Sequence, residues 1–273
     1  MAVYTFVSAS GSPGVTTTAL GLAFALPGRT LLIEADPTGA SGLLAGYWRG
    51  ELDHAGLVEL VMAHRAGVLA EALPRIAMDI DGTGVSVLIG TKSHEQAGSL
   101  TQLWDPLLGV LRDSSMGWDH VLIDAGQLGV EGWPRPLVSY SDTTFLVTRS
   151  TLRSLAGARS WARTLSEDVL PDHHLLALLV GENQPYRASQ VASTLGLGVA
   201  GSIDWDPARA AVYSDGAARP RLWLGGDKAA DRAFELSGYA SSLRTVAQHL
   251  LAMTPAAPPL SAVAVAHEDG SVS

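Results

Sequence analysis

The chain has 273 residues, no cysteine, 47% hydrophobic residues and a formal net charge of −9. This length and composition support one large globular domain or two small ones with a substantial core. The lack of cysteine excludes disulfides and thiolate metal sites and is typical of a reducing cytoplasm, where we expect the protein to reside. The negative charge argues against a general nucleic-acid-binding surface, which needs clustered cations.

The first predicted unit is a strand, a loop of small residues and a helix. The apolar run Val3–Val7 predicts the strand, and a helical pattern begins at Ala19. The loop between them reads Ser10-Gly11-Ser12-Pro13-Gly14-Val15-Thr16-Thr17. A glycine-rich loop at a helix N-terminus binds phosphate through converging backbone N–H groups and the positive end of the helix. A hydroxyl from Thr16 or Thr17 would there reach a Mg²⁺ ion.

This loop resembles the deviant Walker A motif of the ParA/MinD ATPases, K-G-G-x-G-K-[ST]-[ST]. Gly11, Gly14, Thr16 and Thr17 match it. The resemblance implies that the loop contacts ATP or ADP through the seven residues Gly11, Ser12, Pro13, Gly14, Val15, Thr16 and Thr17, and that Thr16 is a magnesium ligand. The alternative interpretation is a plain glycine/serine turn between a strand and a helix.

Both lysines of the motif are missing. Ser10 replaces the signature lysine, which in the ATP-bound dimers of the family reaches the nucleotide of the other subunit. Val15 replaces the lysine that binds the phosphates of the same subunit, as the standard pattern G-x-x-x-x-G-K-[ST] also requires. Pro13 removes one backbone donor from the middle of the loop.

Two further strands end in acidic residues. The strand 30–33 leads into Glu34-Ala35-Asp36-Pro37-Thr38-Gly39, which resembles the family motif D-x-D-P-x-G. Asp36 takes the place of the aspartate near the catalytic water or the Mg²⁺ shell, and Glu34 departs from the first position. The run 118–124 resembles a Walker B strand, so Asp124 is the expected second holder of Mg²⁺. For each motif alone, an acidic turn at a strand end is the alternative; the order and spacing of all three favour the family.

The remaining elements alternate in the same way. We expect helices and turns over 42–75, a loop over 127–142, and a strand at 175–180 followed by Gly181, where the family often has an adenine-reading asparagine; Asn183 comes two residues later. The other expected strands are 84–90 and 143–148, and the other expected helices are 100–111, 152–167, 188–195, 208–214 and 228–252.

The alternation predicts an α/β fold with three layers and a doubly wound, mostly parallel sheet, like a P-loop NTPase of the ParA/MinD type. We expect one domain over 1–253 and a disordered polar tail over 254–273. The closest resemblance within the family is to the TadZ/CpaE-type pilus-localisation proteins and septum-site proteins, whose Walker A loops are often altered.

Three hypotheses about function follow. The first is a degenerate ParA/MinD-like localisation or assembly factor that binds Mg–ATP or Mg–ADP weakly and hydrolyses little or none. The second is an active ATPase of septum placement, partitioning or pilus assembly, with Asp36 catalytic and Arg149 or Arg153 replacing the lysines. The third is a scaffold without nucleotide. In each case we expect protein partners, a homodimer among them, recruitment by a partner to the pole, septum or membrane, no nucleic acid and no direct membrane insertion.

Overall fold

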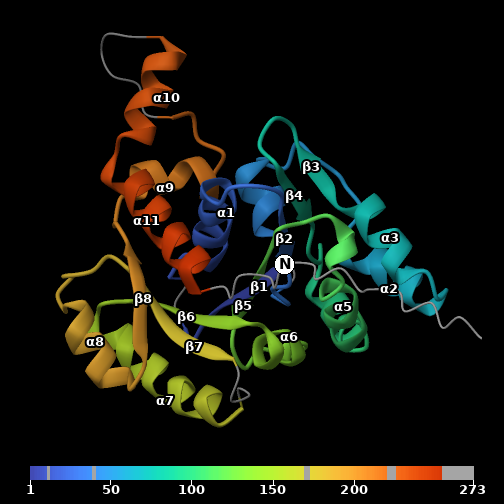
Figure 1. The fold of residues 1–273 in the computed structure, drawn as a ribbon, viewed down its shortest axis with the longest axis horizontal. Helices are drawn as coiled ribbons and strands as arrows, with labels where there is room; N and C mark the ends of the chain where they lie inside the picture. The colour runs from blue at the N-terminus through green and yellow to red at the C-terminus, as the bar shows by residue number, and fades with distance from the viewer. Residues whose placement is uncertain (11–12, 39–40, 169–172, 220–225, 254–273) are drawn as a thin grey trace, which may run out of the picture.

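The computed structural model describes residues 1–10, 13–38, 41–168, 173–219 and 226–253. Within these ranges one sheet has the strand order β3-β4-β2-β5-β1-β6-β7-β8, and all neighbouring strands are parallel except β3 and β4 (Figure 1). The strands are β1 (Ala2–Ser8), β2 (Thr30–Glu34), β3 (Met78–Ile80), β4 (Val85–Leu88), β5 (His120–Gln127), β6 (Thr143–Arg149), β7 (His174–Val180) and β8 (Gly198–Ile203).

Helices cover both faces of this sheet (Figure 1). One face carries α1 (Val15–Ala25), the π-helical turn η1 (Leu43–Tyr47), α9 (Pro207–Ser214), α10 (Asp227–Glu235) and α11 (Gly238–Met253). The other face carries α2 (Leu57–Arg65), α3 (Leu69–Ile76), α4 (Ala97–Leu100), α5 (Trp104–Leu111), α6 (Arg135–Tyr140), α7 (Leu152–Asp168) and α8 (Ala188–Leu195). Two short 3₁₀ turns, η2 (His94–Gln96) and η3 (Ser114–Met116), complete the described helical elements.

The strand side chains alternate between two cores. In β1, Val3 and Val7 pack under the second helical layer, whereas Tyr4 and Phe6 pack under the first. This explains why the central strands read as continuous apolar runs: a parallel sheet between two helical layers buries both of its faces. The predicted three-layer α/β fold with a mostly parallel sheet is confirmed.

The prediction of a loop over 127–142 is wrong in part, because α6 lies within it. The prolines that suggested a loop, Pro134 and Pro136, stand at the start of this helix. Proline is tolerated there since the first N–H groups of a helix have no intrahelical partner.

Two expected helices are interrupted. The first breaks between α4 and α5, and Pro106 falls in the first turn of α5, where its missing N–H is harmless. The second breaks between α10 and α11, where the Ser237 hydroxyl accepts the Ala240 N–H at 3.2 Å and so caps the new helix. The short edge strand β3 was not predicted, since three residues, two of them partly buried and one exposed, give too little pattern.

The predicted tail, 254–273, lies outside the described residues, so the domain boundary at residue 253 stays a prediction. Among the helices that the structure describes, none is long and apolar enough to cross a membrane.

Candidate functional site

The three predicted motifs meet at the carboxyl ends of β1, β2 and β5, which are neighbours in the sheet. Open parallel sheets bind ligands at this end, where the chain order along the sheet changes direction. A cavity of about 350 Å³ lies there. The residues that line it are Ser8, Gly14, Val15, Thr16, Thr17, Asp36, Thr38, Gly126 and Gln127, and we call it the loop cavity.

The loop positions the start of α1 toward this cavity. Gly14 is the N-cap of α1 with a left-handed backbone, φ +94°, which glycine adopts without strain. The helix therefore begins at Val15, and Thr16 and Thr17 lie in its first turn beside unpaired N–H groups. Pro13 lines the neighbouring cavity described below, whereas Gly11 and Ser12 lie outside the described residues.

The residues at the two lysine positions of the motif, Ser10 and Val15, pack against other parts of the protein. Val15 is 7% exposed and belongs to the apolar core beneath α1. Ser10 lies against α7, since a Cβ built on Gly157 would meet the Ser10 Oγ atom at 2.9 Å. Among the described residues that line the loop cavity there is no lysine or arginine.

Asp124 is a buried acid with one unused oxygen. It is 1% exposed, and its Oδ1 atom accepts the Gly126 N–H at 3.0 Å. Its Oδ2 atom is buried and has no hydrogen bond of good geometry, although the Thr16 hydroxyl is near enough to act on its charge. Burial raises the pKa of Asp124 to about 7; Thr16 opposes this rise, and the nearby carboxylates of Asp36 and Glu34 add to it.

The Asp36 side chain contacts Gly126, two residues after Asp124. Its Oδ1 atom accepts the backbone N–H of Thr38 at 2.9 Å and the Thr38 hydroxyl at 2.8 Å. A Cβ built on Gly126 would lie only 2.1 Å from the Asp36 Cγ atom, so the two residues are in close contact. Asp36 and Thr16 line the loop cavity, and Asp124 is buried beside them, close enough for both to act on its charge.

Glu34 has a structural role instead. Its buried carboxylate accepts hydrogen bonds from the Ser41 hydroxyl at 2.5 Å, the Leu43 N–H at 3.0 Å and the Gly90 N–H at 2.9 Å. Burial raises the pKa of Glu34, and these donors counteract the rise. The side chain therefore holds the segment after β2 against the end of β4.

A second cavity of about 280 Å³ adjoins the first, because Gly14 and Thr17 line both. We call it the base-side cavity. Its wall includes Trp205, which is 43% exposed and stacks under the Arg149 guanidinium at 3.8 Å. The other lining residues are Pro13, Thr18, Val180, Ile203, Asp204, Asp206, Pro207, Ala210, Ser214, Asp215 and Tyr239.

The sequence analysis did not identify this wall. The available signal was the run 203–207 at the end of β8, in which an aromatic residue stands between two acids and a proline follows them. Asn183, the nearest candidate for reading a base, lines neither cavity, and its N–H binds the Tyr186 carbonyl at 2.9 Å. Neither candidate arginine, Arg149 or Arg153, lines either cavity; Arg149 contacts the base-side cavity only through Trp205, over whose ring it lies.

Solved structures share this architecture. A ParA family ATPase from Chlorobium tepidum superposes with a TM-score of 0.71 at 15% identity, covering 91% of this chain and 99% of that one. The fold is that of the ParA and MinD ATPases. The septum site-determining protein MinD of Pyrococcus horikoshii, complexed with Mg-ADP, gives 0.64 at 16% identity over 91% and 95% of the two chains.

The MinC:MinD complex of Aquifex aeolicus provides a third match, with a TM-score of 0.65 at 14% identity over 94% of this chain and 98% of that one. No protein-family model matches the sequence, and no curated protein matches it significantly. At these identities the likeness shows the fold alone.

Proposed function

We propose that this protein is a degenerate ParA/MinD-like factor that holds Mg–nucleotide weakly, hydrolyses little or none of it, and acts through protein partners in localisation or assembly. The observation that carries the proposal is that no lysine or arginine lines the loop cavity among the described residues: Val15 is packed in the core and Ser10 rests on α7.

The magnesium end of the site fits the ion. Asp124 Oδ2 is a buried oxygen without a good donor, and the Thr16 hydroxyl lies close to it. Hard cations such as Mg²⁺ take oxygen ligands of this kind, often through water. When bound, the ion would supply positive charge to the phosphates. The N–H groups at the start of α1 and the wall at Trp205 would hold the rest of the nucleotide.

The phosphate end lacks what hydrolysis needs. Phosphoryl transfer is catalysed by positioning and by stabilising the charge that develops on the transferred group. Removing one preorganised contact of this kind costs about 3 kcal/mol or more, a factor of about 10² to 10³ in rate. Ser10 and Val15 replace the two lysines of the motif. Among the described residues, no lysine or arginine lines the cavity in their place. We therefore expect turnover at or below background.

A protein partner is supported by the MinD structure in which MinC is bound. The resemblance to TadZ/CpaE-type proteins favours a role in recruitment to the pole, the septum or the membrane. The second candidate, an active ATPase, requires a substitute cation, and Arg149 is engaged with Trp205 instead.

Calorimetry with ADP and ATP in the presence of Mg²⁺ tests the proposal. We expect weak binding that Asp124→Ala lowers further, while the exposed and distant Asp81→Ala leaves it unchanged. Absence of binding would favour the nucleotide-free scaffold. A steady-state hydrolysis rate on the order of 1 per minute or faster, lost in Asp36→Ala, would favour the active ATPase.

A further inference from the structure

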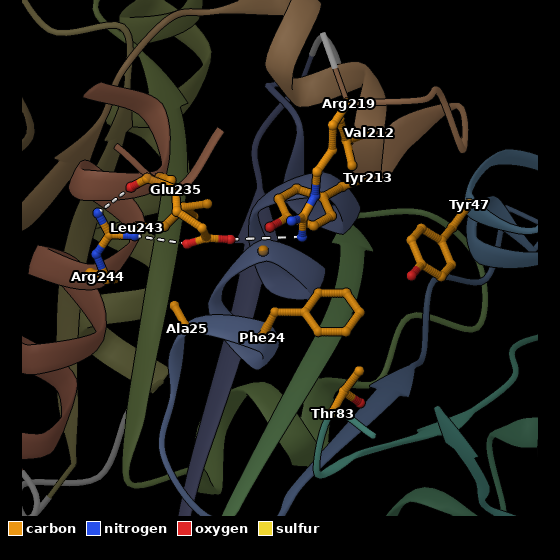
Figure 2. Close-up of a pocket in the computed structure, with 12 residues that line it drawn as sticks. Phe24, Ala25, Tyr47, Thr83, Val212, Tyr213, Arg219, Glu235, Leu243 and Arg244 are labelled. Atoms are coloured by element: carbon orange, nitrogen blue, oxygen red, sulfur yellow. Dashed lines mark hydrogen bonds and ion pairs between the residues drawn. The ribbon is translucent and has the colours of Figure 1, made fainter. Parts of the chain in front are cut away.

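A third cavity, of about 420 Å³, shares no lining residue with the two cavities of the candidate site. Figure 2 shows its walls: α1 below, η1 on the right, α9 and Arg219 above, and α10 with α11 on the left. The segments are far apart in sequence, so the cavity is a product of the fold. We call it the aromatic cavity.

One part of its wall is aromatic. The Phe24 ring stacks on Tyr213 with centroids 5.7 Å apart and an interplanar angle of 19°. It also meets the Tyr47 ring at 6.0 Å. These three rings come from α1, α9 and η1 and form an aromatic wall, in which the Tyr47 ring is tilted by 44° to that of Phe24. Ligand pockets of about 300 to 1,000 Å³ usually combine such a surface with a few polar groups.

The opposite part is charged. Glu235 accepts from Arg244 at 3.1 Å through its carboxylate and at 2.7 Å through its carbonyl, and it lies 3.7 Å from Arg219 (Figure 2). Arg219 also donates to Asp231 at 3.2 Å, and Asp231 does not line the cavity. Each guanidinium has five N–H donors, so most of them are left for another acceptor. Arg219, Arg244 and Glu235 line the cavity, and Asp231 pairs with Arg219 just outside it, so the four charges balance; what the wall offers a ligand is the unused N–H donors of the two guanidinium groups.

Two phenol groups add uncharged donors. Tyr213 is 8% exposed, and its hydroxyl makes no hydrogen bond within the described part of the chain. Burial raises the pKa of Tyr213 to about 12, so the group keeps its proton at neutral pH. The Tyr47 hydroxyl likewise has no hydrogen bond to a described residue, and burial raises its pKa, which the charge of Arg219 opposes. A hydroxyl at a cavity wall that has no acceptor among the described residues is available to donate to a ligand that provides one.

We propose that the aromatic cavity is a binding site for a small aromatic anion, a flat ring system with one carboxylate or phosphate. The ring lies on Phe24 and its two tyrosine neighbours, and the anionic group takes the free donors of Arg219 and Arg244. Arginine pairs with carboxylate and phosphate in two-point contacts. A neutral apolar molecule would leave these donors unsatisfied, and a cation offers them no acceptor. The proposal is independent of nucleotide binding.

The probe for the test is 8-anilinonaphthalene-1-sulfonate, an aromatic anion whose fluorescence rises in apolar sites. We expect saturable binding to the full chain. 1-Naphthoate or 1-naphthyl phosphate should displace the probe, and the stronger of the two identifies the anion. The neutral 1-naphthalenemethanol, of similar shape, should compete about tenfold more weakly or less. Equal competition by the neutral compound would overturn the proposal.

Variants locate the site. Arg219→Gln combined with Arg244→Gln should weaken probe binding about tenfold or more, while Arg65→Gln, at an exposed arginine outside all three cavities, should leave it unchanged. Thr83→Trp adds bulk from an exposed turn at the cavity wall and should weaken binding by steric exclusion. Circular dichroism confirms that each variant is folded. Unchanged binding in the double variant, or a loss of the same size in Trp205→Ala, would overturn the assignment.

Discussion

The guanidinium carbon of Arg149 lies 3.8 Å from the centre of the Trp205 ring. Arg149, the last residue of β6, therefore packs on the ring of Trp205 and does not line the loop cavity. The stack also keeps a half-exposed tryptophan in one orientation beside the loop, where it can face a base.

Trp205→Ala should weaken ADP binding about tenfold, because stacking on an aromatic side chain contributes about 1 to 3 kcal/mol per base. Trp133→Ala is the matched control, since Trp133 packs edge-on against Trp161, outside both site cavities. Calorimetry in the presence of Mg²⁺ gives both affinities. Equal losses in the two variants would show that Trp205 has no special role.

Asp124 should make stability depend on pH. Its pKa rises on folding from 3.8 to about 7, so between these values the folded chain keeps a proton that the unfolded chain has lost. The contribution of this group to stability therefore falls as the pH rises from about 4 to about 7. Asp124→Asn should be more stable than wild type at pH 8 by at most about 4 kcal/mol, and little different at pH 4. Urea unfolding at both pH values measures this.

The Glu34 carboxyl takes part in that experiment. Its pKa is also raised by burial, and its charge acts on Asp124, so the difference between wild type and variant measures Asp124 together with its coupling to Glu34. Equal stability of wild type and Asp124→Asn at pH 8 would show that ionising Asp124 does not destabilise the folded chain.

Gly126→Ala should destabilise the chain more than Gly67→Ala. Both glycines have a left-handed backbone, at φ +62° and +74°, and an alanine there costs about 1 to 2 kcal/mol. Only at Gly126 does the new Cβ also strike Asp36; at Gly67 no atom lies within 4 Å. We expect a loss of about 3 kcal/mol or more for Gly126→Ala, measured by urea unfolding. Losses of equal size would mean that Asp36 moves aside freely.

The oligomeric state should not change with Mg–ATP. The family's signature lysine bridges two subunits through nucleotide, and Ser10 is short, uncharged and turned to α7. ATP then has little differential affinity for a closed dimer, and a ligand shifts an equilibrium only by such a difference. Light scattering with and without saturating Mg–ATP tests this, with Mg–ADP as control. A monomer that dimerises only with ATP would contradict the interpretation of this loop as degenerate.

Much of the fold follows from local patterns. Buried parallel strands need apolar residues on both faces, so β1, β2 and β5 are visible in the sequence, and so are the acids at their ends. Asp36 and Asp124 lie close together because parallel strands deliver their carboxyl ends to one edge, where Asp36 and Thr16 line the loop cavity.

Contacts between distant segments do not follow from such patterns. Nothing in the sequence around Ser10 indicates that α7 presents Gly157 to it, or that Trp205 would be paired with Arg149. The break at Ser237 is a capping hydrogen bond within a continuous helical pattern, and the prolines before α6 read equally as a loop. These features depend on tertiary packing or on the exact register of a helix start.

The hydrogen bonds of Glu34 should affect the rate of amide hydrogen exchange next to the site. One buried carboxylate accepts the amides of Leu43 and Gly90, which belong to segments far apart in the chain. Neither amide can exchange its hydrogen with solvent without removing one of the hydrogen-bond donors that this buried carboxylate has. Their exchange should therefore be slow and synchronous, reporting one cooperative opening of the sheet edge beside Asp36.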